Sequence, residues 1–110
     1  MRLAMVFTFI LLSLSAAPLH RARAENIVIS LRNHQFEPPS QGTRAYVDTT
    51  IVINNLDVTA AEIGSAALKI APVLVEPNSQ VEFALGRLNP GTYDFFDAFH
   101  NDTEYFLVVQ

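Results

Sequence analysis

The 110-residue sequence contains no cysteine. Small domains that work outside the cytosol often depend on disulfides, and this chain must instead be stabilised by apolar packing. The absence also excludes thiolate chemistry: a cysteine nucleophile, structural zinc on sulfur, and the blue-copper ligand set, which requires a thiolate.

Positive charge is also scarce. Seven Lys and Arg residues stand against eleven Asp and Glu residues, which gives a net charge of −4. Nucleic acids and anionic membranes attract basic proteins, so neither is an expected partner, and the acidic balance favours cations. The sequence also lacks a glycine-rich phosphate loop, and Ser65 and Ser79 have no histidine nearby in sequence, so we expect no enzyme.

The first 24 residues have the three-part pattern of a secretory signal peptide. Arg2 provides the positive start, residues 3–14 are almost entirely apolar, and Ala22-Arg23-Ala24 is a small-x-small cleavage site. An uncleaved anchor is the alternative, although the apolar core is shorter than the roughly 20 residues of a membrane span. Cleavage after residue 24 of 110 would leave 86 residues (25–110) as one exported domain. Four basic and eleven acidic residues would remain, a net charge of −7.

Alternating apolar and polar residues predict an all-β fold. We expect strands at residues 26–31, 46–53, 73–75, 80–85, 93–96 and 105–109, with 46–53 in the centre of a sheet. Pro38 and Pro39 make 36–42 an edge segment or a loop. Residues 59–71 are expected to form a short helix or an irregular crossover loop. About seven short strands with at most one short helix indicate a β-sandwich or barrel.

The closing part of the chain carries the candidate binding groups. Residues 97–104 are expected to form a loop that presents three carboxylates and an imidazole between the last two strands. Asp97 and His100 are the core of this hypothesis, because carboxylate and imidazole suit Cu(II), Zn(II) or iron better than Cu(I). The competing interpretation is structural: Asp97 caps a turn and His100 is a packed ring.

Several segments resemble those of cupredoxins and occur in the same order along the chain. They are Phe36-Glu37-Pro38, Asn55-x-Asp57, Glu62-x-x-Ser65 and Leu88-Asn89-Pro90-Gly91-Thr92-Tyr93-Asp94-Phe95-Phe96-Asp97-Ala98-Phe99-His100. The resemblance is strongest to the cupredoxin-like domains of bacterial periplasmic iron-uptake systems. It implies a Greek-key β-sandwich over residues 25–110 and a periplasmic location. It also implies a periplasmic or inner-membrane iron-transport component as partner.

The resemblance also implies a metal site. Blue-copper members carry Cys, His and Met around the loop before the final strand. Here Asp97 stands where the Cys would be, His100 keeps the His position, and Glu104 falls near the Met. Glu62 lies near the place of an earlier His ligand. The implied site therefore holds copper or iron through Glu62, Asp97, His100 and Glu104, and is not a blue-copper site.

Other residues have less defined roles. The iron-uptake relatives carry a second acid at the position of Gly64 and a proline at that of Asn101, so these departures predict weaker binding or a decayed site. His34 and Glu37 could join a site, but solvated edge residues are the expectation for both. Asp102 is expected to be a surface acid.

Two functions are compatible with these features. The first is an exported metal-binding protein for Cu(II) or iron that serves metal uptake or handoff to a membrane transporter. The second is a metal-free interaction module that acts through the closing loop and Phe99. Electron transfer at a non-blue copper is a third, weaker possibility.

Overall fold

The computed structural model describes residues 24–110, so the signal peptide predicted for residues 1–24 lies, apart from Ala24, outside them. The described residues form nine strands and no helix. The strands are β1 (Ala24–Arg32), β2 (Gln35–Glu37), β3 (Ser40–Thr43), β4 (Asp48–Asn55), β5 (Ala61–Ser65), β6 (Ile70–Val75), β7 (Ser79–Arg87), β8 (Gly91–Asp97) and β9 (His100–Val109). None of these residues belongs to a helix long and apolar enough to cross a membrane.

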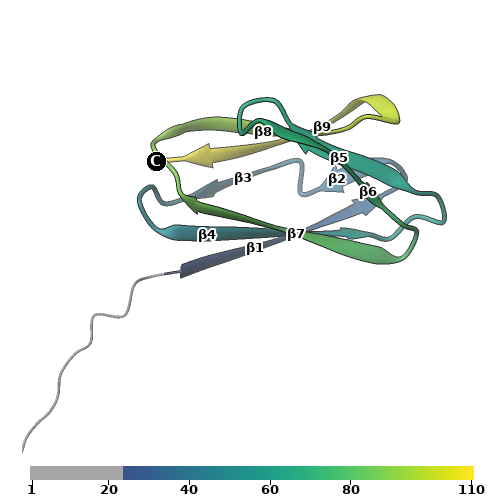
Figure 1. Cartoon of the computed structure of the whole chain (residues 1–110), viewed down its shortest axis with the longest axis horizontal. Helices are drawn as coiled ribbons and strands as arrows, with labels where there is room; N and C mark the ends of the chain where they lie inside the picture. Colours follow the sequence, from purple (N-terminus) through teal and green to yellow (C-terminus); the bar gives the residue numbers. More distant parts are fainter. Residues whose placement is uncertain (1–23) are drawn as a thin grey trace, which may run out of the picture.

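The strands form two sheets that pack face to face (Figure 1). One sheet has the order β2-β1-β4-β7 and the other β3-β9-β8-β5-β6. β1 pairs with β4 and β3 with β9 in parallel, and all other pairs are antiparallel. The predicted all-β Greek-key sandwich is confirmed, with nine strands instead of about seven. β4 is central, as expected, and the proline-rich segment supplies edge strands β2 and β3.

The core lies between the sheets because inward side chains alternate with outward ones along each strand. β1 buries Ile27, Ile29 and Leu31, and the parallel neighbour β4 places Ile51 and Ile53 beside them. The other sheet supplies Ile63, Phe95, Tyr105 and Leu107. This pattern fixes the strand registers, since a one-residue slip would turn each apolar set outward.

Tyr105 is the one fully buried phenol in the described core. Its ring packs between Phe36 and Phe95, with centroids 5.9 and 6.3 Å away. Its hydroxyl is buried and has no hydrogen-bond partner in the described structure. Burial raises the pKa of Tyr105 to about 12, because the low-dielectric interior disfavours the phenolate.

Residues 59–71 form neither the short helix nor the irregular loop that their composition predicts. They contain β5 and the start of β6. Ala61, Ile63 and Ser65 are buried at period two, so Ala61 is a small core residue of a strand. At Gly64 an added Cβ would lie 2.9 Å from the Ile70 carbonyl oxygen and 3.0 Å from the Phe96 ring. This close approach of β6 and β8 explains why no acidic side chain occupies the position.

The prediction of a loop over residues 97–104 is also wrong. β8 continues to Asp97 and β9 begins at His100, which leaves only Ala98 and Phe99 between the strands. Asp97 pairs with His100 while Phe96 pairs with Glu104, so residues 101–103 form a bulge in β9. The polar residues suggested a loop because they lack the alternating apolar side chains of a half-buried strand. The bulge places the start of β9 over the end of the sandwich, beside the turn between β1 and β2.

Candidate metal centre

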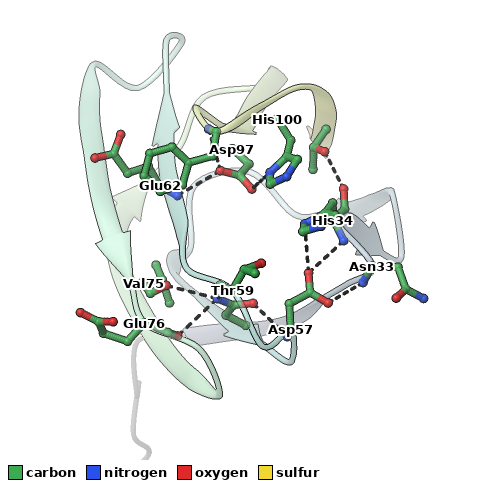
Figure 2. Close-up of polar contacts among 12 residues, drawn as sticks. Asn33, His34, Asp57, Thr59, Glu62, Val75, Glu76, Asp97 and His100 are labelled. Atoms are coloured by element: carbon green, nitrogen blue, oxygen red, sulfur yellow. Dashed lines mark hydrogen bonds and ion pairs between the residues drawn. The ribbon is translucent and has the colours of Figure 1, made fainter.

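Asp97 is buried at the end of β8, and all of its hydrogen bonds are made within the protein. One carboxylate oxygen, Oδ1, accepts the backbone N–H groups of Glu62 and Phe99, both at 3.0 Å. The other, Oδ2, lies 3.0 Å from Nδ1 of His100 (Figure 2). The Asp97 side chain is 0% exposed, so these contacts replace its hydration. Asp97 therefore ties β5, the β8–β9 turn and the start of β9 together.

His100 is held by this carboxylate but remains open to solvent on its other side. Its side chain is 31% exposed. An ionised carboxylate only accepts hydrogen bonds, so the contact places the ring proton on Nδ1 and leaves the lone pair on Nε2. Within residues 24–110, no hydrogen bond reaches Nε2. Carboxylate support of the remote ring nitrogen is typical of metal-binding histidines.

A second aspartate–histidine pair lies at the same end; the sequence indicated His34 as a possible member of a site but not its pairing with Asp57. His34 Nδ1 lies 3.4 Å from Oδ2 of Asp57. Asp57 also accepts the backbone N–H groups of Asn33 at 2.6 Å and His34 at 2.9 Å. Asp57 thus closes the β1–β2 turn onto the segment after β4. His34 is half-buried and not the freely solvated edge residue expected from its position.

The two histidine rings are stacked. Their centroids lie 3.8 Å apart and their planes differ by 19°. His34 comes from the sheet containing β1 and His100 from the sheet containing β9, so the stack joins both sheets (Figure 2). The Thr103 hydroxyl adds a second link by donating a hydrogen bond to the His34 carbonyl.

The β1–β2 turn contains the signal that could have identified His34. Arg32 pairs with Gln35, so Asn33 and His34 form a two-residue hairpin turn, with φ angles of 53° and 60°. Such a turn favours Asn followed by Gly. A left-handed backbone at a non-glycine residue costs about 1 kcal/mol. Histidine at the glycine position is therefore an exception to the local rule that is visible in the sequence.

The structure does not bring the other two predicted ligands to Asp97 and His100. Glu62 contributes its backbone N–H, but it lies between buried Ala61 and Ile63 and its side chain faces the outer surface of the sheet (Figure 2). Glu104 likewise alternates with buried neighbours on β9 and is exposed.

The remaining polar candidates also lie outside this cluster. Glu37 forms an exposed ion pair with Arg32 at 3.4 Å. Asn101 and Asp102 are exposed on the β9 bulge.

These residues do not fit a blue-copper centre. The chain has no thiolate, and both Asp97 oxygens already accept hydrogen bonds. In residues 24–110, no group of three or more His, Cys, Asp or Glu side chains is arranged to hold a metal ion. A metal lies in the ring plane of each imidazole that binds it, about 2 Å from the nitrogen. Two stacked rings 3.8 Å apart therefore cannot share an ion without rotation.

A model of the cupredoxin-like domain matches residues 2–109. The chain belongs to the cupredoxin-like domain family. The family resemblance inferred from the sequence is thereby confirmed at the level of the domain. An uncharacterized protein of Rickettsia prowazekii, RP394, is 29% identical over 84 residues, or 76% of this chain. The match spans 66% of that relative's length.

Solved cupredoxins share the fold at low sequence identity. The M98A mutant of amicyanin with Cu(I) has a TM-score of 0.63 at 17% identity, over 76% of this chain and 81% of that one. Amicyanin from Paracoccus versutus has a TM-score of 0.63 at 13% identity, over 76% of this chain and 80% of that one. A purple cupredoxin from Nitrosopumilus maritimus has a TM-score of 0.61 at 15% identity, over 76% of this chain and 99% of that one. The cupredoxin fold is consistent with a metal-binding or electron-transfer role.

Proposed function

We propose that this cupredoxin-like protein is exported to the periplasm and binds Cu(II) or iron there for uptake or handoff to a transport component of the inner membrane. The observation that carries the proposal is the Asp97–His100 pair. A buried carboxylate fixes Nδ1 of a partly exposed imidazole, which leaves Nε2 as the ligating nitrogen. The role is binding rather than catalysis.

The chemistry of the pair favours particular ions. Imidazole suits borderline divalent metals, and affinity for a given nitrogen and oxygen site increases along the first row to Cu(II). The net charge of −7 expected after signal cleavage, from four basic and eleven acidic residues, would attract cations to the surface. Iron is supported by the sequence resemblance to iron-uptake domains.

Equilibrium dialysis against Cu(II), Zn(II) and Fe(III) tests the proposal. We expect the protein to retain one ion per chain and His100→Gln to weaken the affinity about tenfold or more, the range that disturbing a metal site typically costs. Glu104→Gln is the matched control, because Glu104 is exposed on the outer face and its loss should leave the affinity unchanged. Equal affinity of the parent and His100→Gln would refute this assignment.

One observation favours a second function, a metal-free interaction module. The carboxylate that replaces the copper thiolate already makes three hydrogen bonds, and neighbouring Phe99 is 52% exposed at the tip of the β8–β9 turn. An exposed aromatic side chain on a rigid turn suits contact with a protein partner. This alternative predicts that the parent retains none of the three ions at micromolar concentration, so the same dialysis separates the two functions.

A further inference from the structure

We propose that His34 is a second metal ligand and that the metal site spans both sheets, using Nε2 of His34 and Nε2 of His100. This inference rests on the proposed function, because it names a further ligand of the same site. The β1–β2 turn would supply this ligand, whereas the sequence resemblance pointed to Glu62 and Glu104.

The first argument is the position of His34 in the turn. It has a φ of 60° where a hairpin of this length favours glycine. Its side chain is 42% exposed, so burial does not offset the unfavourable backbone. A residue that keeps an unfavourable backbone conformation at a partly exposed turn points to function.

The second argument is how the ring is held. Nδ1 faces Asp57 and the main chain of His34 is fixed by hydrogen bonds to Asp57 and Thr103. Nε2 has no hydrogen-bond partner among residues 24–110. A carboxylate lies beside Nδ1 of each ring, as a hydrogen bond for His100 and as a looser 3.4 Å contact for His34. Two such pairs, one from each sheet, meet with ring centroids only 3.8 Å apart.

One of the two stacked rings must turn if both are to bind one ion, and their contacts identify which. The His34–Asp57 contact is longer, 3.4 Å against 3.0 Å for His100–Asp97, and the His34 ring is more exposed. Asp57 keeps its backbone hydrogen bonds to Asn33 and His34 when the ring leaves. His34 is therefore the adjustable ligand and His100 the fixed one. Two imidazoles without a thiolate select Cu(II), Ni(II) or Zn(II), with Cu(II) bound tightest.

The test compares His34→Gly with Asn33→Gly in Cu(II) titrations of the purified protein. His34→Gly gives the turn its preferred Asn-Gly sequence, so it should fold at least as stably as the parent. We expect its Cu(II) affinity to fall about tenfold or more. Asn33→Gly also places glycine in the turn but retains the imidazole, and its affinity should equal that of the parent.

Electron paramagnetic resonance of the Cu(II) complexes gives a readout that is independent of stability. The parent and Asn33→Gly should show nitrogen couplings from two imidazoles, and His34→Gly couplings from one. If His34→Gly binds Cu(II) as tightly as the parent while His100→Gln does not, His34 is no ligand but the proposed function survives. If the parent binds no metal ion at all, the proposed function fails as well.

Discussion

The two aspartate–histidine pairs at the end of the sandwich have the same chemistry but different surroundings. The Asp97 side chain is fully buried, and its carboxylate bonds to two backbone N–H groups from different elements. The Asp57 side chain is 11% exposed, and both of its backbone donors belong to one surface turn. The contact to histidine is 3.0 Å in the first pair and 3.4 Å in the second.

This difference indicates that the Asp97 pair has a structural role and that the Asp57 pair leaves its histidine free to move. Asp97 joins β5 to the β8–β9 turn and so helps define the sheet on which His100 is mounted. Asp57 organises a hairpin turn that water can also solvate, so the His34 ring can move without disturbing the sheets. A binding site that combines one fixed and one adjustable ligand can accept an ion with little reorganisation of the backbone.

Replacing Asp97 with Ala should have the largest effect on stability. The partly buried backbone N–H groups of Glu62 and Phe99 would lose their acceptor, and a cavity would remain. We expect the free energy of unfolding to fall by about 3 kcal/mol, measured by urea denaturation. Asp97→Asn keeps an acceptor oxygen and should cost less than half as much. A loss below about 1 kcal/mol for Asp97→Ala would remove the distinction between the pairs.

Replacing Asp57 with Ala should have a smaller effect. Asn33 and His34 would lose an acceptor for their N–H groups, but they lie in a surface turn where water can replace it. We expect a loss of about 1 kcal/mol in the same urea experiment. Nuclear magnetic resonance should show changed amide signals in the β1–β2 turn and unchanged ones in β5. Changes that spread into β5 would contradict the independence of the pairs.

The sheets could be predicted from the sequence because period-two burial is a local property. Ile27, Ile29 and Leu31, for example, identify both β1 and its inward face. Residues 59–71 could not, since the composition that suggested a helix does not reveal the close packing between strands at Gly64. That constraint depends on Phe96 and Ile70, which belong to other strands.

The candidate site was half predictable for the same reason. Asp97 and His100 are three residues apart, so their pairing is local and the sequence identified both. His34 stacks on His100, which lies 66 positions later in the chain. Its partner Asp57 follows β4, 23 positions after His34. Only the unusual turn, Asn33 followed by histidine rather than glycine, marked His34 locally.

Asp97 and Asp57 differ both in burial and in their hydrogen bonds. Tyr105 allows the effects of burial and hydrogen bonding to be distinguished. Its side chain is as deeply buried as that of Asp97, but its hydroxyl has no partner in the described structure. If hydrogen-bond pairing rather than burial makes Asp97 important, removing the Tyr105 hydroxyl should cost nothing.

Tyr105→Phe should therefore leave the free energy of unfolding unchanged or raise it by up to about 1 kcal/mol at neutral pH, because an unpaired buried hydroxyl is lost. Above pH 10 the difference in the free energy of unfolding between the variant and the parent should increase further in favour of the variant. The unfolded phenol ionises near its ordinary pKa of 10.0, whereas burial holds the folded pKa at about 12. Between these values the unfolded parent releases a proton that the folded parent keeps, so the parent loses stability as pH rises. Urea denaturation of both proteins at pH 7 and pH 11 measures the difference. A destabilised variant at pH 7 would show that the hydroxyl has a partner and that burial and pairing coincide here too.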